Sequence, residues 1–243
     1  MSHPISNLRF LELSLYSEDV LHDLNFFQEL GFQSIQTNDI WDYPYAVISD
    51  GRQYIGIHQK ENFDQISPIT RFSFAHENIE ETHRQIHDNN QTLIFSDLDS
   101  DDKIQHTLFR APSGLGTHIL AARPFSPLSN PKESALGYFR AYLIPHTKLN
   151  DSYVFWEQLG LLVTEDKMHG IHISNKDFNA ILGEFSDLEQ PALLFEHPEP
   201  NSIFPTLARH GISVNMPESG LPMNGVFSIK TPLGVELIVR QES

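Results

Sequence analysis

The chain has 243 residues, 40% of them hydrophobic and 20% charged, which is the balance of a globular protein with a substantial core. The formal net charge of −16 repels phosphate backbones, so nucleic acid is not expected as a partner. The lack of cysteine excludes disulfides and thiolate ligands, and no run approaches the roughly 20 apolar residues of a membrane span. The first ten residues lack the basic flank and apolar run of a secretory signal. We therefore expect a cytoplasmic protein with no membrane partner.

The first quarter of the chain predicts one helix among four strands. Period-2 alternation at residues 8–16 (LRFLELSLY) indicates a half-buried strand. An acidic start at Glu18 and Asp19 and a glycine at position 31 bound a helix that contains FFQELGF, residues 26–32. Three short strand-like runs follow at residues 32–37, 45–51 and 52–59, with a turn at Asp50 and Gly51.

The second quarter repeats this order. A strand at residues 69–75 (ITRFSFA) leads into a helix at residues 78–90, and strands follow at residues 92–97, 106–114 and 116–124. The acidic segment 97–102 has the spaced carboxylates of a calcium loop but lacks its glycine at position six and its glutamate at position twelve. We interpret this segment as a solvated hairpin turn.

The second half of the chain begins after a linker at residues 124–135, which is rich in proline and serine. A strand at residues 138–144 and a helix ending in FWEQLGL, residues 155–161, repeat the start of the chain, and strand-like runs follow at residues 163–167, 170–175 and 178–185. The last quarter has a strand at residues 191–197, a short helix at residues 202–211 and strands at residues 225–234 and 235–241. A strand, a helix and further strands thus recur four times.

This order resembles the vicinal-oxygen-chelate superfamily of glyoxalases, bleomycin-resistance proteins and extradiol dioxygenases. FFQELGF and FWEQLGL are similar to its aromatic-aromatic-x-x-Leu-Gly-Phe helix ending. The turns APSGLGTHIL (111–120) and TPLGVELIV (231–239) are similar to its Asp-Pro-x-Gly turn, with Ala111 and Thr231 in place of the aspartate. The resemblance covers almost the whole chain.

The resemblance implies an α+β fold in which four βαβββ modules pair into two cup-shaped mixed sheets with helices packed outside. The first domain is expected at residues 1–123, with modules 1–66 and 67–123, and a second, degenerate domain at residues 136–243. The sequence leaves open whether neighbouring modules pair or whether the pairing is crossed.

In metal-dependent members of the superfamily, the ligands come from the first and last strands of the paired modules. Glu12 and His118 match those positions, and His58 lies two residues beyond the matching Gly56 on the same strand face. One carboxylate and two imidazoles suit Fe, Mn, Zn or Ni as a divalent ion. Arg71, at or next to the fourth position, argues against a metal because a guanidinium cannot bind one.

Two functional hypotheses follow. The first is a metal-free protein that binds a small polar molecule in the cup of the first domain, like the antibiotic-sequestering members of the superfamily. The residues expected to contact this molecule are Glu12, Ser14, Tyr54, His58, Arg71, Ser73 and His118. The alternative is a metal-dependent lyase, isomerase or dioxygenase with Glu12, His58 and His118 as ligands. Neither hypothesis assigns a catalytic residue, and a homodimer is compatible with both.

Structural roles are also open for these residues. Glu12 is expected to pair with Arg71 if it holds no ligand, His58 to be exposed at a strand end, and His118 to be hydrogen-bonded within its sheet. The matching positions of the second half are Ala141, Ala192 or a neighbour of it, and Ile238, none of which can bind a metal. We therefore expect a functional site in the first half only.

Overall fold

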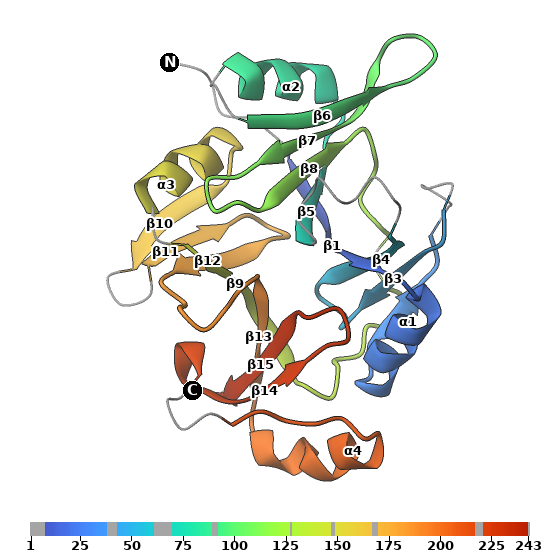
Figure 1. Cartoon of the computed structure of the whole chain (residues 1–243), viewed down its shortest axis with the longest axis vertical. Helices are drawn as coiled ribbons and strands as arrows, with labels where there is room; N and C mark the ends of the chain where they lie inside the picture. The colour runs from blue at the N-terminus through green and yellow to red at the C-terminus, as the bar shows by residue number, and fades with distance from the viewer. Residues whose placement is uncertain are drawn as a thin grey trace. The chain divides into compact units, whose positions relative to one another are not determined.

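The structure, a computed structural model, describes residues 8–37, 43–60, 70–88, 92–126, 128–146, 149–166, 170–216 and 221–242. The strands of the first half are β1 (Arg9–Ser17), β2 (Gln33–Ile35), β3 (Tyr45–Ser49), β4 (Tyr54–Gln59), β5 (Thr70–Ala75), β6 (Thr92–Leu98), β7 (Ile104–Arg110) and β8 (Gly116–Leu120). They form one sheet in the order β2-β3-β4-β1-β5-β8-β7-β6, and Figure 1 labels these strands except β2. The sheet is mixed, because β5 and β8 are parallel whereas β7 is antiparallel to both of its neighbours.

The strands of the second half form a second mixed sheet. They are β9 (Tyr138–Pro145), β10 (Leu162–Asp166), β11 (Gly170–Ser174), β12 (Asn179–Gly183), β13 (Ala192–His197), β14 (Gly225–Lys230) and β15 (Glu236–Gln241). Their order is β10-β11-β12-β9-β13-β15-β14, with β13 and β15 parallel. Neighbouring modules therefore share a sheet, the first with the second and the third with the fourth.

One helix follows the first strand of each module. These helices are α1 (Val20–Glu29), α2 (Ile79–Asp88), α3 (Leu149–Gln158) and α4 (Phe204–Arg209), the last preceded by the 3-10 turn η2 (Pro200–Ile203). α1 packs against β3 and β4, α2 against β7, and α3 against β10 and β11. The fourth module departs from the predicted βαβββ pattern: between α4 and β14, the described residues form no further strand, but two isolated bridges, from Asn215 to Ser228 and from Leu221 to Gly225, and the 3-10 turn η3 (Pro222–Asn224). Pro217, which has no amide hydrogen to donate, follows the first of these bridges.

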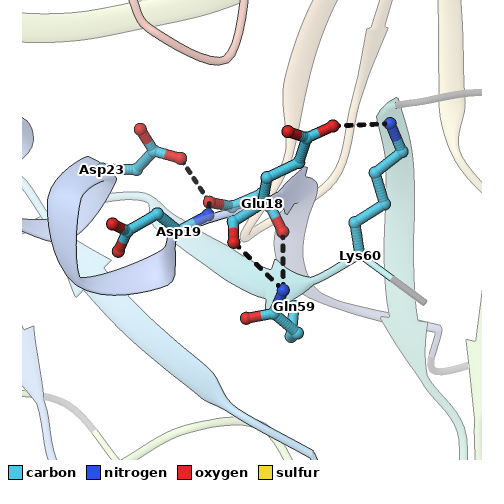
Figure 2. A network of polar contacts seen from close by, with 6 residues as sticks. Glu18, Asp19, Asp23, Gln59 and Lys60 are labelled. Atoms are coloured by element: carbon cyan, nitrogen blue, oxygen red, sulfur yellow. Dashed lines mark hydrogen bonds and ion pairs between the residues drawn. The ribbon is translucent and has the colours of Figure 1, made fainter.

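A polar network ties the corner between β1 and α1 to the end of β4 (Figure 2). Asp19 is the N-cap of α1, and the hydroxyl of Ser17 accepts a hydrogen bond from its backbone N–H at 2.9 Å. The side-chain amide of Gln59 donates to the main-chain oxygen of Glu18 at 3.2 Å. Because Gln59 follows His58 in β4, the network fixes the strand that presents His58.

The two faces of β5 have different chemistry, although all six of its residues are buried. Phe72 and Phe74 contact Phe178, with ring centroids 5.2 Å and 5.4 Å apart, in an aromatic cluster that also includes Trp156. Alternation along the strand directs Arg71 and Ser73 to the opposite face. The apolar core therefore occupies one face of β5 and leaves the other for polar groups.

By its contacts the chain divides into two compact units. The first comprises Met1–Ser14, Glu61–Ser126 and His146–Glu184; the second comprises Leu15–Lys60, Pro127–Pro145 and Phe185–Ser243. Each unit thus draws on both halves of the chain, and the boundaries 1–123, 124–135 and 136–243 stay a prediction. The predicted α+β class with two mixed sheets of paired modules is confirmed. Within the described ranges, no helix is long and apolar enough to cross a membrane.

Candidate functional site

A row of polar side chains runs across five neighbouring strands of the first sheet, β1, β5, β8, β7 and β6. We call this row the polar wall; it consists of Glu12, Ser14, Arg71, Ser73, His118, His106 and Asp97. The strand register places Ser73 beside His118 and places His106 beside Asp97. The whole row lies in the first compact unit, so its geometry is that of a single body.

Ser14 joins β1 and β5, the two central strands of the eight-stranded sheet. Its hydroxyl donates to Glu12 Oε1 at 2.9 Å and lies 2.7 Å from Ser73 Oγ. Since a hydroxyl has only one proton, donation to Glu12 leaves Ser73 as the donor in the second contact. All three residues are 1% exposed. The hydrogen bonds offset part of the free energy that burial of these polar groups costs.

His118 and His106 form a second hydrogen-bonded chain, which ends at Asp97. His118 Nε2 lies 3.0 Å from His106 Nδ1, and His106 Nε2 lies 3.2 Å from Asp97 Oδ2. Burial lowers the pKa of His106, and the positive charge of Arg71 lowers it further, whereas the Asp97 carboxylate acts in the opposite direction. The His106 ring is therefore neutral at neutral pH.

The wall becomes accessible to solvent toward β6. His118 is 3% exposed, the His106 side chain 17% and the Asp97 side chain 66%. Phe95 on β6 packs against both imidazoles, with ring centroids 5.5 Å from His106 and 6.3 Å from His118. The exposure of the wall therefore increases from His118 through His106 to Asp97.

Arg71 has room on the wall because its neighbour across the strand pair is a glycine. The register pairs Arg71 with Gly116, and a Cβ atom on Gly116 would lie 2.8 Å from Arg71 Cγ. A side chain at that position would displace the guanidinium stem. The residue of β5 that pairs with His118 is Ser73, and Arg71 precedes Ser73 by two residues on the same face of the strand.

His58 and Tyr54 belong to the second compact unit. His58 is 1% exposed, which contradicts the expectation of an exposed strand end. The reason is aromatic packing: Tyr45 and Tyr16 lie with ring centroids 4.5 Å and 5.3 Å from the imidazole, and the Tyr43 hydroxyl lies 3.2 Å from His58 Nδ1. Tyr54 stands at the start of β4, opposite Ser49.

The three donors predicted for a metal are divided between the two compact units. Glu12 and His118 belong to the first unit and His58 to the second. Among the residues that the structure describes, no three His, Asp or Glu side chains are placed to hold a metal ion. Glu12 Oε1 and His118 Nε2 are instead engaged with Ser14 and His106. The set of Glu12, His58 and His118 as three metal ligands therefore stays a prediction.

The structure thus links Glu12, Ser14 and Ser73 directly and places His118 beside them in register. The sequence interpretation missed His106 and assigned Asp97 only to a turn. Alternation along residues 104–110 does place His106 on one face with Leu108, but the register with β8 and β6 that brings it to His118 and Asp97 is a tertiary property.

Comparison with solved structures identifies similar folds across nearly the whole chain. A catechol 2,3-dioxygenase aligns over 97% of this chain and 88% of its own, with 14% identity and a TM-score of 0.61. The 2,3-dioxygenase LapB from Pseudomonas sp. KL28 aligns over 97% and 92%, with 15% identity and a TM-score of 0.58. An Mn(II)-bound glyoxalase from Novosphingobium aromaticivorans aligns over 98% and 83%, with 11% identity and a TM-score of 0.57.

No protein-family model and no curated protein matches the sequence. The likeness therefore rests on structure, and it extends to dioxygenases and a glyoxalase alike. The chain shares its fold with extradiol dioxygenases and a glyoxalase, in agreement with the resemblance found in its sequence.

Proposed function

We propose that the chain binds a small, oxygen-rich polar molecule at the polar wall, without a metal ion. The observation that carries this proposal is the buried hydrogen-bonded chain from Ser73 through Ser14 to Glu12. Its members sit at the centre of a sheet, where apolar side chains are the stable default. A carboxylate and two hydroxyls held there in one line favour recognition of a polar ligand.

The charges of the wall suit such a molecule. Arg71 offers guanidinium donors on β5, and Glu12 offers a carboxylate acceptor on β1. His118 adds an imidazole between them and the accessible end of the wall. A ligand that carries both hydroxyl and carbonyl or carboxylate oxygens would match these donors and acceptors. Tyr54 and His58 remain predicted contacts of the same ligand.

The alternative is a divalent-metal-dependent lyase, isomerase or dioxygenase with Glu12, His58 and His118 as ligands. Its support is the Mn(II)-bound state of the glyoxalase with a similar fold. The hydrogen bonds of Glu12 with Ser14 and of His118 with His106 favour the metal-free version.

A thermal-shift screen tests the proposal. The probes are a library of small hydroxy acids, phenols and diols, applied to untagged protein treated with chelator. We expect several probes to stabilise the wild-type protein and to lose at least ten-fold in affinity in Ser73→Val. The matched control is Ser228→Val, a buried serine on β14 of the other sheet, which should keep the wild-type affinity.

Two results would contradict the proposal. The first is a set of hits whose affinity is equal in Ser73→Val, Arg71→Ala and wild type. The second is stabilisation by Mn, Fe, Zn or Ni that Glu12→Gln and His118→Ala each abolish, which would establish the metal-dependent alternative.

A further inference from the structure

A cleft of about 610 Å³ lies within the second compact unit and shares no residue with the polar wall. Helix α1 contributes residues that recur on one of its faces, His22, Asn25, Phe26 and Glu29. The other residues of the cleft belong to the segment 210–215, which follows α4, and to residues 230–232 at the end of β14. Binding sites for small molecules enclose about 300–1,000 Å³, so the cleft has the size of such a site.

Part of the cleft lining is apolar. The apolar residues are Phe26, Ile212, Val214 and Pro232. All four keep part of their surface exposed to solvent. Transfer of apolar surface out of water is favourable, so a ligand with a hydrocarbon body would be stabilised here. The lining therefore favours a more apolar ligand than the oxygen-rich molecule proposed for the polar wall.

The charges of the cleft leave Lys230 without an ion-pair partner among the described residues. Glu29, the acidic residue of the lining, lies 3.9 Å from Nδ1 of His210. Lys230 and Glu236 are opposite each other in the register of β14 and β15, but within the described range 221–242 no ion pair joins their side chains. In a chain with 32 acidic and 16 basic side chains, a lysine without such a partner in a cleft favours an anionic ligand.

A buried hydroxyl also belongs to the cleft lining. Thr231 is 3% exposed, and its Oγ1 has no hydrogen-bond partner within the part of the chain that the structure describes. Burial of a hydroxyl without a hydrogen bond costs free energy, and a ligand oxygen that accepts a hydrogen bond from Thr231 would offset this cost. Lys230 precedes Thr231 directly, so one anionic group of the ligand can interact with both residues.

We propose that this cleft binds a small organic acid with an apolar body. The carboxylate of the ligand lies beside Lys230 and accepts a hydrogen bond from the Thr231 hydroxyl, while its hydrocarbon part covers Phe26 and Ile212. The inference goes beyond the function proposed for the polar wall and does not depend on it, because the two sites have no residue in common.

Titration of ¹⁵N-histidine-labelled full-length protein with phenylacetate and with octanoate tests the inference, because His22 and His210 line the cleft and report binding there. Neither probe carries a hydroxyl, which separates these acids from the ligands proposed for the polar wall. We expect the NMR signals of the His22 and His210 rings to shift along a saturable curve, while those of His118 and His106 stay unchanged. The neutral counterparts phenylacetamide and octanamide should bind about two- to five-fold more weakly, the range of an exposed charge pair.

Two variants test the site directly, both at exposed positions where the fold should persist. Lys230→Gln should weaken the binding of both acids by about two- to five-fold and that of the amides by less. Asn25→Trp should fill the cleft from α1 and weaken the binding of acids and amides alike by at least about ten-fold. The matched control is Lys176→Gln, which removes the same charge from an exposed position of the first unit and should keep the wild-type affinity.

Any of several results would overturn the inference: no shift at His22 and His210 with either acid, equal affinities for each acid and its amide, or equal affinities in Lys230→Gln and Lys176→Gln. Ser73→Val, a variant of the polar wall, should bind both acids as the wild type does. Loss of acid binding in Ser73→Val would place the acids at the polar wall and would also overturn the inference. Failure of the screen for polar ligands would leave these results intact, so the two proposals fail separately.

Discussion

The hydroxyls of Ser14 and Ser73 meet at 2.7 Å on the buried face that β1 and β5 share. Ser14→Ala removes this contact and the hydrogen bond to Glu12 Oε1 together. We expect the free energy of unfolding to fall by about 1–3 kcal/mol, since buried polar groups are left with fewer partners. Chemical denaturation measures the change.

A second buried serine serves as the control. Ser152 on α3 is fully buried, and its hydroxyl has no hydrogen-bond partner among the described residues. Ser152→Ala should therefore be neutral or stabilising. Equal losses in both variants would show that the Ser14 hydroxyl contributes nothing beyond its volume.

Asp50 predicts a distinct pH dependence of stability. Burial raises the pKa of this carboxyl above its ordinary value of 3.8, and backbone hydrogen bonds from Gln53 and Arg52 oppose the shift. The pKa of Asp50 is higher in the folded than in the unfolded protein. Protonated Asp50 therefore contributes its full stabilisation below pH 3.8, and this stabilisation is lost as the pH rises through the folded-state pKa. The ionised Asp50 thus costs stability at neutral pH.

Asp50→Asn removes this titration while keeping an oxygen for the two backbone donors. Between about pH 4 and about pH 7, the free energy of unfolding of the wild-type protein should fall by on the order of 1 kcal/mol relative to that of the variant. This is the cost of a buried polar group whose hydrogen bonds do not fully compensate for burial. Urea denaturation at both pH values gives the difference. A difference that does not change with pH, or one of the opposite sign, would show that Asp50 is ionised at no cost.

Alanine substitutions at Gly170 and Gly211 distinguish the cost of backbone strain from the cost of a steric clash. Both have positive φ, +108° and +69°, but a Cβ on Gly170 would lie 2.0 Å from the Leu182 oxygen, whereas a Cβ on Gly211 would meet nothing within 4 Å. Gly211→Ala should cost about 1–2 kcal/mol from strain alone. Gly170→Ala should cost more than about 3 kcal/mol, because the β11–β12 pair must also separate. Similar losses in thermal denaturation would contradict the close approach of β12 to Gly170.

Gly116 and Arg71 should be energetically coupled. Gly116→Ala places a methyl group against the Arg71 stem and should cost about 1–3 kcal/mol by overpacking. The same substitution in an Arg71→Ala background should cost at least about 1 kcal/mol less, which a double-mutant cycle measures. Additive effects would place the Arg71 side chain away from Gly116 and off the polar wall.

More of the fold than of the site could be predicted from the sequence. Alternation at residues 8–16 and 69–75 and the repeated helix endings were enough to place β1, β5, α1 and α3, because these features are local. Residues 212–216 were not predicted as a strand, and the structure forms only an isolated bridge there, at Asn215.

Pairing between strands explains why the surroundings of His118 and His58 differ from those predicted from the sequence. Glu12 was predicted from its match to a ligand position of the superfamily, and strand alternation put Ser14 on the same face. Their hydrogen bond confirms that they share a face. The partners of His118 and the aromatic rings around His58 come from other strands, whose register no local pattern specifies. The exposed position expected for His58 was wrong for this reason.

The most direct test of the polar wall is to follow its imidazoles while a hit from the thermal-shift screen is titrated into ¹⁵N-histidine-labelled protein. Binding at the wall predicts that the ring signals of His118 and His106 shift with the same dissociation constant as the thermal stabilisation, while those of His210, on the second unit, stay unchanged. Saturation of the protein with no change at His118 or His106 would contradict the central claim and place the ligand elsewhere.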